Sequence, residues 1–429
     1  MKRNLLTLFA ALLIGSMTFA QVRPYDKTGL NVFETPKVDT LQYTGLKIKI
    51  GGAFTQSWQS LQDSHSYVPV NGVDPNKLVA LAPGFNTANA NLYFNVQLGD
   101  GILLNLTQYL SSRHHNETWV KGGFIQFDKL PFLHSAFVDN LMKYTTIKVG
   151  HMEINYGDAH FRRSDNGNSI YNPFIENNIM DEFATEIGME VDVQHNGFLA
   201  VGGVTNGEIK GDELKATAYP GGSDGKHHPT FLGKIGFDKK LADNVRLRVT
   251  GSGYYTAGSV ANTLFGGDRG GSHYFYVIEK ASTTSEAFSG RFNPGFSDKI
   301  GALMGNIFLK AGGFEWFTTL ETAKGRAKNE TIERTANQAV TDAVYRFGSN
   351  ENFWLGARYN YVKAGLLDAT SKVYNVNLNR TAFSAGWFVT KNIMAKAEYV
   401  NQNYNDFLPT DIRNNAKFNG VVIEAVVGF

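Results

Sequence analysis

Apolar and polar positions alternate along almost the whole chain after residue 44. Leu46, Ile48 and Ile50 share one face of the first such segment, and Lys47 and Lys49 share the other. Period-two patterning of this kind predicts β-strands with one apolar and one polar face. The pattern predicts sixteen strands, at 45–55, 90–98, 101–109, 118–127, 144–151, 183–194, 197–205, 229–238, 244–255, 302–311, 313–322, 338–347, 352–362, 377–389, 392–402 and 417–429.

The connections between these strands alternate in length, which is typical of membrane barrels with short turns at one end and long loops at the other. The connection 128–143 breaks the alternation, and we expect a short helix there. A soluble sandwich or propeller is the alternative, but it does not account for the alternation. The short connections are 99–101, 195–197, 239–243, 312, 348–352 and 390–392; the long ones are 56–89, 152–182, 206–228, 256–301, 323–337, 363–376 and 403–416.

The last nine residues form an apolar alternating strand that ends on an aromatic residue. In a closed outer-membrane barrel this segment would be the last strand, with one row of side chains facing lipid and the final aromatic side chain in the interfacial girdle. Phe429 is therefore our candidate assembly signal. The lipid-facing row would be Val421, Ile423, Ala425, Val427 and Phe429.

The first twenty residues have the pattern of an export signal. Lys2 and Arg3 precede an apolar run, and small residues lead to Ala20. The run is shorter than the ~18 residues that a spanning helix requires, so we interpret it as a cleaved signal. The sequence thus predicts a signal peptide at 1–20, a periplasmic N-terminal segment at 21–44 and an outer-membrane barrel at 45–429.

Composition agrees with an all-β membrane protein. The signal carries two of the 41 basic residues and none of the 39 acidic residues, so 39 of each sign remain and nucleic-acid binding driven by bulk charge is excluded. The chain has no cysteine, and therefore no disulfide framework. Its mean hydropathy of -0.24 and its 13% aromatic content suit strands that alternate between lipid and water. We expect a transmembrane antiparallel up-and-down β-barrel with long external loops.

A sixteen-stranded barrel is wide enough to hold an aqueous channel, so function would depend on inward-facing residues and on loops inside the lumen. Rings of one charge sign select ions. The alternative is that the inward charges are solvated ion pairs with little selectivity. The pore-lining candidates are Arg246, Arg248, Arg358, Lys148, Lys396, Glu186 and Glu190.

The connection 152–182 is the candidate constriction. Its length suggests a functional loop, and its aromatic content is too high for a disordered segment. We expect it to fold into the lumen; an external cap is the alternative. Its charged residues are Arg162, Arg163, Asp158, Asp165 and Asp181.

Two stretches carry a resemblance to a known family: 144–151, Tyr-Thr-Thr-Ile-Lys-Val-Gly-His, and 384–400, which includes Trp387 and Lys396. They resemble the hairpins of sixteen-stranded Gram-negative outer-membrane porins, most closely the phosphate-selective porin O and P type. The resemblance implies a porin for small hydrophilic solutes or ions. It also implies a modest anion preference, from Arg162, Arg163, Arg246, Arg248 and Arg358.

No catalytic constellation is apparent in the sequence. His151 and His195 stand at predicted strand ends without a convincing partner, so we expect no enzyme activity. His114-His115 and His227-His228 are interpreted as solvated loop residues, and no metal or cofactor is expected. The glycine-rich run 266–271 lacks the strand-to-helix context of a phosphate loop and is interpreted as a flexible external turn.

The expected partners are outer-membrane lipid, the barrel-assembly machinery and small hydrophilic solutes or anions, with a homo-oligomer left open and nucleic acid excluded. The alternative function is an adhesin or envelope-complex scaffold with a plugged lumen. The loops 56–89 and 256–301 would then form its binding surface.

Overall fold

The structure is a computed structural model, and it describes residues 33–35, 37, 43–69, 74–111, 118–283 and 288–429. The expected signal peptide, 1–20, lies outside the described residues, as does most of the segment 21–44. None of the helices within the described ranges has the length and hydropathy needed to span a membrane.

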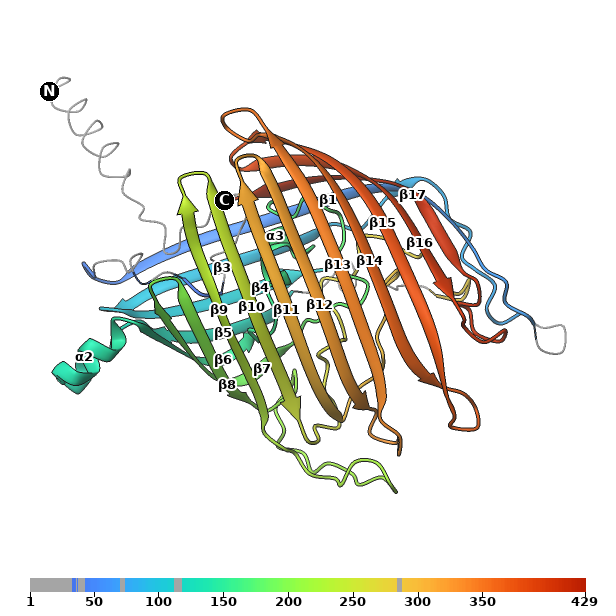
Figure 1. Cartoon of the computed structure of the whole chain (residues 1–429), viewed down its shortest axis with the longest axis horizontal. Helices are drawn as coiled ribbons and strands as arrows, with labels where there is room; N and C mark the ends of the chain where they lie inside the picture. Colours follow the sequence, from blue (N-terminus) through green and yellow to red (C-terminus); the bar gives the residue numbers. More distant parts are fainter. Residues whose placement is uncertain (1–32, 36, 38–42, 70–73, 112–117, 284–287) are drawn as a thin grey trace, which may run out of the picture.

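Sixteen long antiparallel strands form a closed barrel (Figure 1). Closure is direct, because β1 pairs with β3 on one side and with β17 on the other. The strands are β1 (Lys47–Ser64), β3 (Asn89–Gly99), β4 (Ile102–Leu110), β5 (Trp119–Phe127), β6 (Thr145–Glu153), β7 (Thr185–His195), β8 (Phe198–Thr205), β9 (Thr230–Ala242), β10 (Val245–Thr256), β11 (Lys299–Ala311), β12 (Phe314–Arg326), β13 (Arg334–Phe347), β14 (Phe353–Leu367), β15 (Val373–Thr390), β16 (Ile393–Asn405) and β17 (Lys417–Gly428), and the two-residue β2 (Gly84–Phe85) pairs with β1.

All sixteen predicted strands are confirmed, but several are longer than predicted at the long-loop end. Pairing between β12 and β13, for example, continues through Ala323↔Ala336 to Gly325↔Arg334. The sequence pattern marks only the part of a strand that has apolar residues on its lipid side. Backbone pairing needs no such residues, so it continues into water beyond that part.

The connection between β5 and β6 contains the expected short helix. A 3-10 turn, η2 (Pro131–Leu133), precedes α2 (Ala136–Met142), and Ser135 caps α2 by accepting a hydrogen bond from the Val138 amide at 3.5 Å. Two further short elements, η3 (Ala159–Phe161) and α3 (Asn166–Ser169), lie between β6 and β7.

The two faces of the wall differ as the alternation predicts. On β17, Val421, Ile423 and Val427 are exposed on the outside, whereas Glu424 is completely buried on the inside. Exposed aromatic residues form a girdle near the short turns, where the Phe353 and Trp387 rings stack 5.7 Å apart. A closed barrel with an apolar outer belt satisfies its backbone hydrogen bonds internally, and this chain lies in the cell outer membrane.

Phe429 completes the junction between the first and last strands. Its amide donates to the Gly52 carbonyl at 2.9 Å, and the Gly52 amide donates to the Phe429 carbonyl at 3.1 Å. The Phe429 ring lies over Gly52, where a Cβ atom would come within 2.9 Å of a ring carbon. The ring is 73% exposed on the lipid side, consistent with a place in the girdle.

Candidate functional site in the barrel lumen

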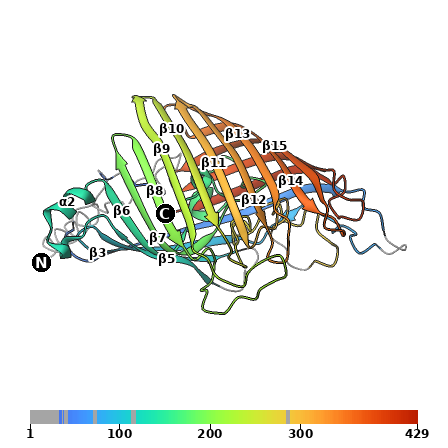
Figure 2. The same cartoon turned by 60° about the horizontal axis from the view of Figure 1, so that its bottom comes forward.

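Two loops from different hairpins fill much of the lumen. The first inner loop (154–184) connects β6 to β7, and the second inner loop (257–298, of which 284–287 are outside the described residues) connects β10 to β11. Figure 2 shows loop segments inside the strands as well as beyond their ends. The apolar residues of both loops are buried together with inward-facing wall residues, so the loops form a packed core inside the barrel. Members of this core are Ile175, Ile179, Met180, Leu264, Phe265, Tyr274, Phe292 and Phe296.

The position of the second inner loop corrects the sequence analysis. The sequence predicts a long external loop at 256–301, with its run 266–271 as a flexible external turn. The run is inside the barrel, and most of the described loop is buried, although residues 280–282 are exposed. Asp268 is 1% exposed, and Phe292 donates its amide to the Ile179 carbonyl of the first inner loop at 2.7 Å. The loop has enough aromatic residues to build a core, which is the same signal that suggested an inward position for 152–182.

Cations on the wall hold the first inner loop through its carbonyl groups. Arg358 donates to the Glu176 carbonyl at 2.8 Å, and Arg380 donates to the Asn177 carbonyl at 2.8 Å. Lys396 donates to the Phe174 carbonyl at 2.7 Å. These basic residues on β14, β15 and β16 therefore serve as attachment points for the loop.

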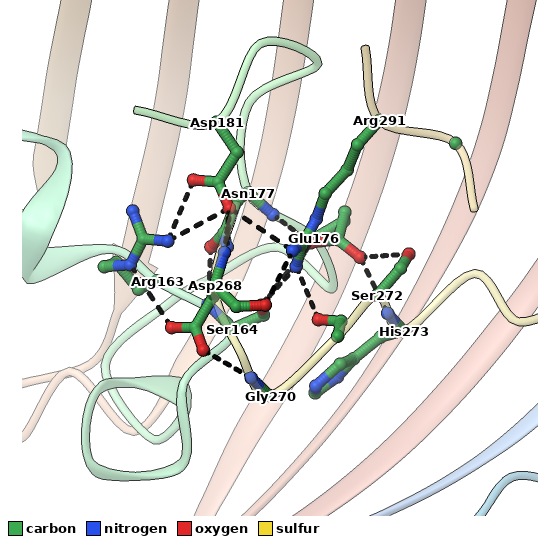
Figure 3. A network of polar contacts seen from close by, with 12 residues as sticks. Arg163, Ser164, Glu176, Asn177, Asp181, Asp268, Gly270, Ser272, His273 and Arg291 are labelled. Atoms are coloured by element: carbon green, nitrogen blue, oxygen red, sulfur yellow. Dashed lines mark hydrogen bonds and ion pairs between the residues drawn. The ribbon is translucent and has the colours of Figure 1, made fainter. Parts of the chain in front are cut away.

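An ion-pair network joins the two inner loops (Figure 3). Arg163 contacts Asp181 of its own loop at 2.8 Å and Asp268 of the second loop at 3.7 Å. Arg291 of the second loop contacts Glu176 of the first at 2.9 Å and Asp181 at 3.4 Å. Backbone amides add to the network, since Asp268 donates its own N–H to Asp181 at 2.9 Å.

The network sets the charge state of its acids. Burial alone would raise the pKa of Glu176, but the Arg291 guanidinium and His273 overcome it and lower that pKa to about 2. The pKa of Asp268 is also lowered against the effect of burial, mainly by Lys121 and Arg163. These carboxylates therefore remain ionised, and each is compensated by a cation.

The five predicted constriction residues are all in the lumen, but each is paired. Arg162 contacts Glu315 at 2.6 Å and Asp342 at 3.1 Å, and its side chain is 1% exposed. Asp158 contacts Arg248 at 2.7 Å and Lys234 at 3.0 Å. Asp165 contacts Lys121 at 2.9 Å, while Arg163 and Asp181 belong to the network between the loops. Their role in a constriction stays a prediction, and their charges are compensated inside the packed lumen.

The predicted pore-lining residues face inward in the strand register, and most are also neutralised. Arg246 binds Asp238 at 2.8 Å, and Arg358 binds Asp342 at 2.7 Å. Lys148 contacts Glu190 at 2.8 Å and Asp192 at 2.9 Å, and Lys396 contacts Glu424 at 2.9 Å. Glu186 accepts hydrogen bonds from the Tyr254 hydroxyl, at 2.7 Å, and from Thr205. Most of this set is therefore ion-paired, as the alternative expects, but most of the pairs are buried rather than solvated, and their effect on selectivity stays a prediction.

Part of the segment 21–44 lies inside the barrel, which the sequence analysis did not predict. Glu34 is 5% exposed and contacts Lys234 at 2.9 Å and Arg248 at 3.0 Å. Asn155 of the first inner loop donates to the same carboxylate at 2.9 Å. Burial raises the pKa of Glu34, but Arg248 and Lys234 outweigh it and lower the pKa to about 2. A single Glu in a polar segment carries no signal from which this contact could have been predicted.

The lumen keeps a cavity of about 530 Å³ between the first inner loop and the wall formed by β1, β3, β4, β5 and β6. Its lining includes amides, hydroxyls and aromatic rings: Asn95, Asn105, Thr107, Tyr93, Phe124 and Tyr171. Lys49 lines it as well, and none of the described residues forms an ion pair with its ammonium group. On the opposite side, the gap between Arg162, Phe317 and Arg358 has a volume of only about 10 Å³. That volume is no more than one water molecule requires, so the loop is tightly packed there.

His151 and His195 each contact a neighbouring polar group, whereas His114 and His115 lie outside the described residues. His151 contacts the Thr185 hydroxyl at 3.1 Å, and His195 contacts the Asn196 amide at 3.0 Å. Throughout the described part of the chain, no group of three or more His, Cys, Asp or Glu residues could hold a metal ion. The absence of enzyme activity stays a prediction.

Comparison with known proteins identifies a fold and no family. No family model matches the chain, and no curated protein matches it. Among solved structures, the chain is similar to the anion-selective porin from Comamonas acidovorans, with a TM-score of 0.52, 9% identity, and coverage of 90% of this chain and 100% of the porin. It is equally similar to the outer membrane channel DcaP of Acinetobacter baumannii, with a TM-score of 0.52, 9% identity, and coverage of 90% and 99%. OmpT, an outer membrane protein of Vibrio cholerae, in a form lacking loop L8, gives a TM-score of 0.51 at 10% identity over 90% and 99%. The chain therefore has the sixteen-stranded barrel fold of outer-membrane porins and channels.

Proposed function

We propose that this protein is an outer-membrane porin through which small hydrophilic solutes or ions diffuse. The observation that carries the proposal is the cavity of about 530 Å³ beside the first inner loop. Amides and hydroxyls line it, together with two lysines, Lys49 and Lys391, that form no ion pair with any described residue. The rest of the lumen is occupied by packed loops, so this side of the barrel is where a solute would pass. The similarity to a porin and to a channel supports the same role.

A modest anion preference is the second part of the proposal. We assign it to Lys49, which is not among the constriction or pore-lining candidates of the sequence analysis. The guanidinium groups of Arg162 and Arg163 are buried in ion pairs, so they offer little charge to a passing ion. Lys49 lines the cavity, and no described residue forms an ion pair with it. One unit charge ~4 Å from an ion contributes about 1 kcal/mol in water and more where water is partly excluded, which corresponds to a selectivity of several-fold.

Planar-bilayer recording on the purified protein tests both parts. We expect stable ion conductance, and reversal potentials in a salt gradient that favour anions by a few-fold. Lys49→Gln should reduce this ratio, because it removes one of the two unpaired charges at the cavity and keeps the side chain polar. Lys129→Gln is the matched control, since Lys129 is paired with Asp100 outside the lumen. Absence of conductance contradicts the porin; a cation preference, or an unchanged ratio in Lys49→Gln, contradicts the role of Lys49.

The packed inner loops also favour a second candidate, a scaffold or adhesin barrel whose lumen does not conduct. The loop 206–229 would then supply the outer surface, since Leu214 there is 84% exposed. Liposome swelling separates the two candidates. A porin should admit small sugars at rates that fall with solute size, whereas a scaffold should give rates equal to those of protein-free liposomes.

The resemblance to phosphate-selective porins O and P leads to one further comparison. Phosphate should compete with chloride for the Lys49 side of the cavity if selectivity of that type is present. Chloride conductance measured with increasing phosphate provides the test. A decline in conductance would support phosphate binding in this pore, and an unchanged conductance would contradict it.

A further inference from the structure

The segment 131–144, which contains η2 and α2, exposes an unusual number of apolar side chains outside the barrel. Phe137 is 77% exposed, Phe132 56%, and both Leu133 and Leu141 51%. Figures 1 and 2 both show α2 projecting past the ends of β5 and β6, away from the lumen. The barrel itself therefore leaves these side chains uncovered.

The exposed residues lie on one side of the helix. Phe137 and Leu141 are one turn apart and point in nearly the same direction. Met142 faces the protein and is 3% exposed, whereas Asp139 and Lys143 are polar and exposed in other directions. This arrangement gives a short amphipathic element with one apolar side.

The apolar side is continuous with the lipid-facing surface of the barrel. Phe127 ends β5 on the outward row, because Gln126 and Phe124 on the inward row line the lumen cavity. The Phe132 ring packs edge-on against Phe127, with centroids 6.4 Å apart. Tyr144, at the other end of the segment, is 44% exposed and packs edge-on against His195 at 4.8 Å. Both ends of the segment thus join the outer surface at the level of the short turns.

We propose that residues 131–144 form a membrane-interface foot, which inserts Phe132, Leu133, Phe137 and Leu141 into the phospholipid leaflet at the short-turn end of the barrel. Amphipathic helices with aromatic and leucine side chains lie in the plane of the interface in this way, with the polar side in water. The foot extends the aromatic girdle sideways from β5 and β6. It would fix the depth of this part of the barrel, where the wall lacks a tight turn.

The chain offers a clean test because it contains no cysteine. Single-cysteine variants Phe137→Cys and Leu141→Cys carry a nitroxide label on the apolar side, and Asp139→Cys carries it on a polar side as the matched control. Each full-length variant is reconstituted into vesicles of phosphatidylethanolamine and phosphatidylglycerol at high dilution, after heat-modifiability has confirmed a folded barrel. Power-saturation spectroscopy then compares collisions with oxygen, which concentrates in lipid, and with a water-soluble nickel chelate.

We expect oxygen to dominate at positions 137 and 141 and the nickel chelate to dominate at position 139. Dominance of the chelate at all three positions would place the segment in water and overturn the proposal. Protection from both reagents at 137 and 141 would indicate a protein contact, either with a second copy or with another partner, and would overturn it as well. A label that is oxygen-accessible at only one of the two apolar positions would contradict insertion of the whole side.

Discussion

The carboxylate of Asp268 links the second inner loop to both the first inner loop and the wall. Removing its negative charge should therefore loosen the second inner loop. Its carboxylate lies 3.3 Å from Lys121 of β5 and 3.7 Å from Arg163 of the first inner loop, and it accepts the Gly270 amide at 2.6 Å. Asp268→Asn keeps the shape and removes the charge. Each cation retains another carboxylate, so the cost should be below the ~3–5 kcal/mol of a fully broken buried pair. We expect about 2 kcal/mol, which is roughly a 30-fold increase in the population of undocked loop.

Two measurements follow the undocked state in the folded barrel. Bilayer recordings of Asp268→Asn should show more frequent current fluctuations, and limited proteolysis should cut within 257–298 faster than in the parent. Heat-modifiability should not change, because strand pairing closes the barrel without this residue. Asp100→Asn is the control, since its pair with Lys129 is about half exposed and such pairs contribute ~0–1 kcal/mol. Equal fluctuation and cleavage rates in the parent and in Asp268→Asn would refute the view that this charge holds the loop.

Three further predictions concern the loops and the seam. Burial and neighbouring Asp181 raise the pKa of Glu182 from 4.5 to about 7, so the carboxyl keeps its proton in the packed first inner loop and loses it when the loop is released. The packing of this loop in the lumen should therefore be most stable below about pH 4.5. Its free energy should weaken by up to roughly 3 kcal/mol as the pH rises through 7. Proteolysis of the first inner loop should accelerate over that range in the parent and much less in Glu182→Gln, and a pH-independent parent would contradict the assignment. Arg358→Lys should destabilise the attachment of the first inner loop to the wall by ~2 kcal/mol, because lysine cannot keep both the two-point contact with Asp342 and the bond to the Glu176 carbonyl. Conductance fluctuations equal to those of the parent would argue against this role. Deletion of Phe429 should lower the yield of heat-modifiable barrel more than Phe429→Ala does, because the alanine variant keeps the two backbone hydrogen bonds to Gly52. Equal yields from the two variants would show that only the aromatic ring matters.

The strands were predictable and the inner loops only partly so, for a physical reason. Lipid on one side and polar lumen on the other impose a period of two, so the sixteen strands and the short turns between them can be read from local pattern. The depth of a loop depends on partners far away in the sequence. Ile175 donates its amide to Glu398, 223 positions later, and no local pattern encodes that bond.

The charged residues illustrate the same limit. Inward orientation of Arg162 or Lys148 follows from alternation and loop position, but their neutralisation depends on which carboxylate lies opposite in the closed barrel. Glu315 reaches Arg162 across a separation of 153 positions. The sequence thus indicates which charged side chains face the lumen. Their ion-pair partners determine how much of that charge a solute can reach, and the partners are known only from the closed barrel.

The placement of Glu424 has a consequence for the order of assembly. This residue stands on the closing strand, where it contacts Lys396 at 2.9 Å, accepts a hydrogen bond from Ser57 of the first strand at 3.0 Å, and binds His273 of the second inner loop. The sequence separation of 367 between Ser57 and Glu424 makes this pairing a late event in folding. An empty lumen at that moment would leave the Glu424 carboxylate without its histidine, and a loop arriving afterwards would have to enter a finished ring. The seam and the second inner loop therefore share one buried carboxylate, which keeps only its wall partners Lys396 and Ser57 when the loop is absent.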